Sequence, residues 1–199
     1  MPTQIRKLRY HVATSLDGFI AREDGSTDCF PGDLQAEHVT DYLFTLAAEY
    51  DTVLMGRATY EVGLKLGVGD PYPQLDTYVF SRTPKASPHP RVHWVGEDAV
   101  GVVRGLKARA GTDVDWSRTI QGLPARTPKD IYLGGGGDFA RTLLAEGLID
   151  EVQLKVNPVL LGTGRPLVAG LPRDVPLELL STKTYRTGVV LLRYAVRRP

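Results

Sequence analysis

The chain has 199 residues, a length typical of one α/β domain, which buries roughly 70 % of the surface that its unfolded form exposes. Its 24 Lys and Arg against 23 Asp and Glu give a net charge of +1, which offers no strong field for nucleic acid or a membrane surface. No signal-peptide core or membrane-spanning apolar run occurs, so we expect a soluble, cytoplasmic protein. A single cysteine, Cys29, excludes an internal disulfide.

The first half of the chain alternates β-rich runs with helical periodicity. Residues 8–14 are predicted to form a strand, and residues 35–50 an amphipathic helix whose apolar side chains recur at i, i+3, i+4 spacing. The side chains expected on its buried face are Val39, Tyr42, Leu43, Leu46, Ala47 and Tyr50. A strand over residues 51–55, a short helix from Arg57 and a strand over residues 77–80 follow.

A further strand and helix precede a long irregular stretch. Residues 92–95 are predicted to form a strand, and Asp98 can cap the helix that follows. That helix would turn four side chains inward: Val100, Val103, Leu106 and Ala110. Residues 111–129 lack clear periodicity, so we expect a long surface loop there.

The last third turns β-rich after one more helix. A strand over residues 131–133 leads through glycines into a helix over residues 139–147, with Phe139, Leu143 and Leu144 buried. The remaining strands are expected over residues 151–156, 177–185 and 189–196, the last two joined by hairpin residues 186–188. The order of elements favours an α/β architecture, and residues 1–199 are expected to form a single domain.

Four consecutive glycines separate a predicted strand from a predicted helix. Because Gly134, Gly135, Gly136 and Gly137 lack Cβ atoms, their N–H groups can approach a pyrophosphate, and the helix N-terminus adds partial positive charge. The alternative is a tight turn between packed elements. The run is not G-x-G-x-x-G and no acidic residue ends a strand about 20 residues later, so an ordinary Rossmann site is not indicated.

Two other turns offer groups that suit an anion. After the strand over residues 51–55, Gly56 permits close approach, Arg57 supplies charged donors and Thr59 supplies a hydroxyl. Ser81 and Arg82 close the next strand and suit a ribose 2′-phosphate, because they offer a hydroxyl and a guanidinium without a carboxylate. For each turn, the alternative is an ordinary solvated side chain.

Five ordered segments carry a resemblance to a known family. They are S-L-D-G-F-I-A at 15–21, M-G-R-A-T-Y-E at 55–61, F-S-R at 80–82, the glycines at 134–137, and E-G-L-I-D-E-V at 146–152 followed by P-V-L-L-G-T-G at 158–164. With them the chain resembles the dihydrofolate reductase-like superfamily, and within it the reductase domain of riboflavin biosynthesis, the RibD C-terminal family. The resemblance implies a three-layer α/β/α fold with a mostly parallel mixed sheet and a β-rich C-terminal third ending in a hairpin.

The resemblance also implies an activity and a cofactor. The expected protein is an NADPH-dependent reductase, a homodimer, acting on a small heterocyclic substrate of the ribosylamino-pyrimidine or pterin type. Ala13 and Ile20 would border the nicotinamide, and Ser81 and Arg82 would take the 2′-phosphate. The pyrophosphate would be held by Gly56, Arg57, Thr59, Gly134, Gly135, Gly136 and Gly137.

Departures from the family pattern leave the substrate open. Riboflavin-pathway reductases typically carry an acidic residue directly before the glycine run, where this chain has Gly134. Dihydrofolate reductase presents a helix carboxylate to the pterin, and Asp33, Glu37 and Asp41 are candidates, although a solvated acidic face explains them as well. Two alternatives therefore remain: an NADP(H)-binding protein without turnover, and a dihydrofolate reductase proper.

Asp17 is the candidate catalytic residue. It lies in the loop expected to cover the nicotinamide, where a carboxylate can accept substrate hydroxyls or relay a proton. The alternative is a turn aspartate bonded to the amide of Gly18 or Phe19. The histidines form no metal-ligand pattern, because His89 and His93 cannot share a helical face, so we expect no metal.

Overall fold

The computed structural model describes residues 6–109 and 129–198, except residues 66, 84 and 88. Ala110 and residues 111–128 of the predicted loop lie outside the described residues. The helices are α1 (Glu37–Glu49), α2 (Arg57–Lys65), α3 (Ala99–Ala108) and α4 (Gly137–Ala145). The strands are β1 (Leu8–Thr14), β2 (Phe19–Ala21), β3 (Tyr50–Gly56), β4 (Asp76–Phe80), β5 (Val92–Val95), β6 (Asp130–Leu133), β7 (Glu151–Val156), β8 (Arg165–Pro166), β9 (Leu177–Thr184) and β10 (Val190–Val196).

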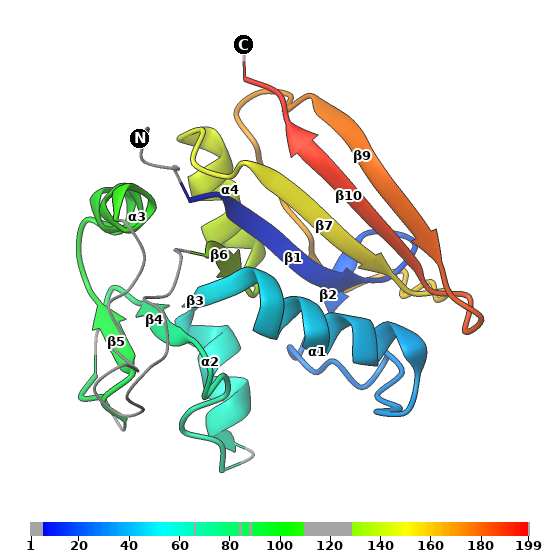
Figure 1. Ribbon diagram of the computed structural model, residues 1–199, viewed down its shortest axis with the longest axis horizontal. Coiled ribbons are helices and arrows are strands. Elements are labelled where there is room, and N and C mark those ends of the chain that lie inside the picture. The colour runs from blue at the N-terminus through cyan, green and yellow to red at the C-terminus, as the bar shows by residue number, and fades with distance from the viewer. Residues whose placement is uncertain (1–5, 66, 84, 88, 110–128, 199) are drawn as a thin grey trace, which may run out of the picture.

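The described strands form one large sheet and one small one (Figure 1). The large sheet has the order β5-β4-β3-β6-β1-β7-β10-β9, in which the strands from β5 to β7 run parallel and β10 and β9 are antiparallel. The small antiparallel sheet pairs β2 with β8. The predicted mostly parallel mixed sheet, with a C-terminal hairpin, is confirmed.

Helices cover both faces of the parallel part because the strands there are apolar on both sides. On one face α3 and α4 pack in a cluster with alternate β1 residues Leu8, Tyr10 and Val12. On the other face α1 and α2 contribute Leu46 and Tyr60 to a second cluster. The sheet partners in this second cluster are Val53, Met55, Val79, Val92 and Tyr132. The sheet therefore lies between two layers of helices, α3 and α4 on one face and α1 and α2 on the other, as the predicted three-layer fold requires.

The buried face of α1 is narrower than its sequence pattern indicates. Val39 and Leu46 are buried, but Leu43 is 52 % exposed and Ala47 is exposed as well, so their predicted burial is wrong. Leu43 and Ala47 each follow a sheet-facing residue by one position, which rotates them about 100° around the helix axis. The same correction applies on α4, where Phe139 is only half-buried while Leu143 and Leu144 are buried.

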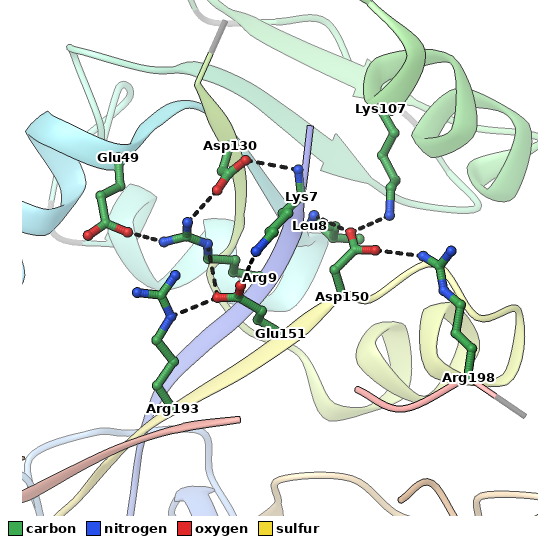
Figure 2. A network of polar contacts seen from close by, with 10 residues as sticks. All are labelled: Lys7, Leu8, Arg9, Glu49, Lys107, Asp130, Asp150, Glu151, Arg193 and Arg198. Atoms are coloured by element: carbon green, nitrogen blue, oxygen red, sulfur yellow. Dashed lines mark hydrogen bonds and ion pairs between the residues drawn. The ribbon is translucent and has the colours of Figure 1, made fainter. Parts of the chain in front are cut away.

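Polar side chains tie together the amino-terminal ends of β1, β6 and β7 (Figure 2). Arg9 pairs with Glu49, Asp130 and Glu151, and Glu151 also accepts from Arg193 and Lys7 at 2.7 Å each. Beside it, Asp150 accepts from the Leu8 amide at 2.8 Å and from Lys107 and Arg198. Ion pairs therefore hold together the amino-terminal ends of these strands. The predicted anion-binding turns begin at the opposite, carboxyl-terminal ends.

Local signals at two turns are confirmed. The side chain of Asp98 accepts from the Gly101 amide at 3.0 Å and caps α3. In the hairpin, the Tyr185 amide donates to the Val189 carbonyl at 2.9 Å and the Gly188 amide donates back to Tyr185 at 3.0 Å. Within the described ranges, no helix is long and apolar enough to cross a lipid bilayer.

Candidate functional site

A cleft of about 1390 Å³ opens at the carboxyl ends of the parallel strands. Ligands of open α/β sheets bind at such ends, where neighbouring strand connections diverge. Every residue that we predicted to contact the cofactor lines this cleft: Ala13, Ile20, Gly56, Arg57, Thr59, Ser81, Arg82, Gly134, Gly135, Gly136 and Gly137. Segments up to about 120 residues apart in sequence meet there because β1, β6, β3 and β4 are neighbours in the sheet.

The turn after β6 meets the turn after β3. Gly135 and Gly136 have φ of +137° and +92°, a region that only glycine adopts without strain. A Cβ on Gly135 would lie 3.5 Å from the Thr59 hydroxyl, and one on Gly136 would lie 3.9 Å from the Gly56 nitrogen. The two turns and the first turn of α2 thus form one continuous backbone wall of the cleft.

The other two glycines of the run have a packing reason. A Cβ on Gly137 would lie 2.5 Å from the Pro166 carbonyl oxygen, so α4 can begin this close to β8 only with glycine. A Cβ on Gly134 would lie 3.1 Å from the Tyr132 ring. The packed-turn interpretation therefore accounts for Gly134 and Gly137, and the need for positive φ accounts for Gly135 and Gly136.

The turns after β3 and β4 share one basic cluster. Arg57 Nη1 lies 3.4 Å from Thr83 Oγ1, and the Thr83 amide donates to Ser81 Oγ at 3.1 Å. Glu61 lies in the same wall at 4.0 Å from Arg57 Nε, and a hydrogen bond from Lys85 lowers the pKa of Glu61. Arg57 thus reaches from its own turn to the turn that we predicted to hold a separate phosphate.

The cleft is basic although the whole chain is almost neutral. Its lining includes six basic side chains but only three acidic ones. The basic residues are Arg57, Lys65, Arg82, Arg141, Lys155 and Arg165, and the acidic ones are Asp24, Glu61 and Asp138. Such an excess in a concave site concentrates anions, an effect that a net charge of +1 conceals.

The structure does not bring Asp17 into this group. Its exposed carboxylate accepts from the amides of Leu161 at 3.0 Å and Gly162 at 2.7 Å, and from Ser15 Oγ at 2.6 Å. The hydrogen bond from Ser15, with those from the two amides, lowers the pKa of Asp17. Asp17 is not among the residues that line the cleft, and its contacts fasten the loop after β1 to the loop after β7.

The acidic candidates near α1 also lie elsewhere. Asp33 accepts from the Gln35 amide at 2.9 Å, Asp41 accepts from Lys183 at 2.6 Å, and Glu37 lies 3.1 Å from Lys183. None of the three acids lines the cleft. The contribution of α1 to the cleft is an aromatic side chain, Tyr42, rather than a carboxylate.

One end of the cleft is an inner chamber formed by His11, Tyr42, Tyr72, Tyr132 and Lys155. The hydroxyls of Tyr42 and Tyr132 lie 3.0 Å apart, and the His11 ring meets the Tyr42 ring edge to face at 5.3 Å. The Lys155 ammonium lies 5.9 Å from the centre of the Tyr42 ring. This chamber lies on the α1 face of the sheet.

Burial determines the protonation of the inner chamber. Burial lowers the pKa of His11 to about 3, and the charge of Lys155 acts in the same direction, so the imidazole is neutral at physiological pH. Burial likewise lowers the pKa of Lys155 and raises those of Tyr42 and Tyr132 well above their usual value. The chamber therefore offers neutral donors beside one ammonium. Among the described residues, no group of three or more His, Cys, Asp or Glu is arranged to hold a metal.

No sequence motif pointed to the inner chamber. The signal that was available is the alternation in β7, where Glu151, Gln153 and Lys155 share one face of an otherwise apolar strand. Register places Lys155 beside Ala13 and Gln153 beside His11. Only the pairing of β1 with β7 shows that Lys155, at the carboxyl end of this row, lines the cleft, whereas Glu151 at the other end joins the ion pairs with Lys7, Arg9 and Arg193.

Comparison with known proteins agrees with the fold. The RibD C-terminal domain model matches residues 6–191. The uncharacterized protein YwjB of Bacillus subtilis (strain 168) is 32 % identical over 189 residues, covering 94 % of this chain and 96 % of that protein.

Two solved structures are similar over nearly their whole length. A putative riboflavin biosynthesis protein from Shewanella sp. PV-4 is 23 % identical, with a TM-score of 0.72 and coverage of 96 % of this chain and 99 % of that one. A dihydrofolate reductase from Enterococcus faecalis, complexed with NADP(H) and RAB-propyl, is 16 % identical, with a TM-score of 0.64 and coverage of 96 % and 97 %. The chain has the reductase-type fold of the dihydrofolate reductase-like superfamily and belongs to the RibD C-terminal domain family.

Proposed function

We propose that the protein is an NADPH-dependent reductase of a small heterocyclic substrate. The observation that carries the proposal is the basic cleft, in which three strand-end turns bring backbone amides, hydroxyls and guanidinium groups to one wall. The resemblance to a structure complexed with NADP(H) supports the same cofactor.

The residues fit a phosphorylated dinucleotide. Positive φ at Gly135 and Gly136 keeps side chains out of the wall, and the N-termini of α2 and α4 open onto the cleft. Arg57 and Arg82 supply charge for phosphate groups, and Lys85 and Arg57 partly neutralise Glu61 between them. The bound cofactor would supply a hydride, and Ala13 and Ile20 would shield the reacting ring from water.

The inner chamber favours this reductase over a dihydrofolate reductase proper. Pterin recognition of the dihydrofolate reductase type needs a carboxylate at the substrate end, whereas α1 offers Tyr42 there. Of the acids on α1, Glu37 and Asp41 pair with Lys183, and Glu49 pairs with Arg9. The nearest cation in the chamber, Lys155, would repel a protonated pterin ring. We therefore place the substrate among unprotonated heterocycles.

Two measurements on the purified protein test the proposal. NADPH at 100 times its dissociation constant should add roughly 2.7 kcal/mol to the free energy of unfolding, and an unchanged melting curve at millimolar NADPH would contradict cofactor binding. Oxidation of NADPH, followed by absorbance against ribosylamino-pyrimidine and dihydrofolate substrates, tests turnover. Tight binding without oxidation of any of them would favour a binding protein instead.

A homodimer remains part of the proposal. The edge strand β9 is exposed along its whole length, and its leucines Leu177, Leu179 and Leu180 are 44 %, 54 % and 48 % exposed. Exposed strand edges with apolar side chains promote association unless they are covered. A second copy of the chain would cover this edge.

A further inference from the structure

Lys155 carries a charge inside the cleft that no acidic side chain compensates. Among the described residues, the side chain of Lys155 makes no ion pair and no hydrogen bond. Its ammonium makes a cation–π contact with the Tyr42 ring. The neighbouring cations on the same sheet face are paired: Arg9 and Arg193 both bind Glu151. Lys155 is half-buried, so its ammonium meets solvent in the cleft, and an unpaired cation at that position favours a ligand with negative charge.

His11 gives a second, independent sign of an absent partner. The ring is 3 % exposed and lines the cleft, and its Nδ1 has no hydrogen-bond partner among the described residues. Buried polar nitrogens are nearly always bonded in native proteins. The position of His11 on β1, two residue pairs from Lys155 along the β1–β7 ladder, places both groups on one face of the sheet.

The rest of the chamber suits a flat ring. Three tyrosines, Tyr42, Tyr72 and Tyr132, line this end of the cleft and pack against one another, and the Tyr72 and Tyr132 rings meet edge to face at 5.7 Å. The acidic lining residues belong to other parts of the cleft: Glu61 lies on α2, Asp138 on α4, and Asp24 accepts from the Ser26 amide in the loop after β2. A ring held here meets donors, aromatic faces and one cation.

We propose that Lys155 determines specificity by pairing with a negatively charged group on a planar heterocyclic substrate, which lies against the tyrosines at this end of the cleft and accepts a hydrogen bond from His11. This inference rests on the proposed reductase function, because it assigns the substrate end of the same cleft. The substrate is thus an anionic heterocycle, and a protonated amino-substituted ring is excluded by charge.

The test compares three pyrimidines of different charge by calorimetry, without cofactor. Orotate is an anion, uracil is neutral and 2,4-diaminopyrimidine is in part cationic. A charge-assisted hydrogen bond corresponds to a preference of roughly 10- to 150-fold for orotate over uracil, with 2,4-diaminopyrimidine weakest. Lys155→Met should abolish the preference and Lys155→Arg should retain most of it. Lys183→Met, which removes the same charge from β9 at a position that does not line the cleft, should leave it unchanged.

Each outcome is decisive. Equal affinities for the three pyrimidines, tightest binding of 2,4-diaminopyrimidine, an orotate preference that survives Lys155→Met, or no binding at millimolar concentration to folded protein would overturn the proposal. Circular dichroism melting of each variant confirms that it is folded. NADPH binding is measured separately, so failure of the chamber assignment is distinguishable from failure of the reductase assignment.

Discussion

At the scale of single residues, the proposed preference for NADPH over NADH depends on Arg82. Its exposed guanidinium follows β4 and has no polar partner in the part of the chain that the structure describes. We expect Arg82→Ala to weaken NADPH roughly 10- to 150-fold and to leave NADH nearly unchanged, because only NADPH carries the 2′-phosphate. Fluorescence titration with both cofactors measures the effect.

Variants of two other arginines serve as comparisons for this prediction. Because Arg57 reaches Thr83, Arg57→Ala should weaken both cofactors, and NADPH more than NADH. Arg104→Ala, on the exposed face of α3 beside Glu146, should change neither. Equal weakening of NADH and NADPH by Arg82→Ala would remove Ser81 and Arg82 from the 2′-phosphate site.

At the scale of elements, the packing of α4 against β8 depends on Gly137, the first residue of the helix. A Cβ at Gly137 would collide with the Pro166 backbone carbonyl, so Gly137→Ala must push β8 away from the helix. We expect a loss of about 1–3 kcal/mol in the free energy of unfolding, measured by urea denaturation. Because Pro166 and Arg165 line the cleft, NADPH binding should weaken as well.

The matched change is Gly105→Ala on α3. That glycine is exposed, and an added Cβ would meet nothing within 4 Å. Relative to glycine, alanine in a helix interior favours folding by roughly 0.5–1 kcal/mol, so this variant should be more stable than the parent chain. If both variants were destabilised equally, the packing reason given for Gly137 would be incorrect.

At the scale of the whole molecule, the ion-pair network around Glu151 should make the free energy of unfolding depend on pH in the acidic range. Burial disfavours the charged form of Glu151, but hydrogen bonds from Arg193 and Lys7 outweigh it and lower the pKa. The stabilisation is therefore complete above the unfolded-state pKa of about 4.3 and is lost as the pH falls through the lower folded-state pKa.

Glu151→Gln should remove this stabilisation at every pH. Because the carboxylate is buried among three cations, we expect a loss of about 3–5 kcal/mol at pH 7, measured by urea denaturation. The change in stability between pH 5 and the lowered pKa should also become smaller. Glu146→Gln, which breaks an exposed pair with Arg104, should cost less than about 1 kcal/mol. Similar losses for both variants would show that burial of the network contributes little.

The exposed β9 edge gives a prediction about assembly. If a second copy covers this edge, Leu179→Asp should convert a dimer into a monomer, because a carboxylate would then be buried at the interface. Sedimentation velocity at micromolar concentration measures the change. Parent chain that sediments as a monomer at this concentration would contradict the proposed dimer.

Local and periodic features of this protein could be read from the sequence alone. Residues 8–14 and 92–95, the Asp98 cap and the 186–188 hairpin were predicted correctly because propensity, capping and turn chemistry act within a few residues. The glycine and arginine turns could be identified for the same reason, since each follows a strand directly. The family resemblance gave the order of layers.

Only the tertiary structure decided which of these residues meet. Asp17 binds the amides of the loop after β7 and does not line the cleft. It can do so because β7 and that loop lie beside β1, although the two segments are about 140 residues apart in sequence. Lys155 faces the cleft for the same reason, through its register with Ala13. Pairing across the sheet depends on the total burial of distant strands, which no local pattern records.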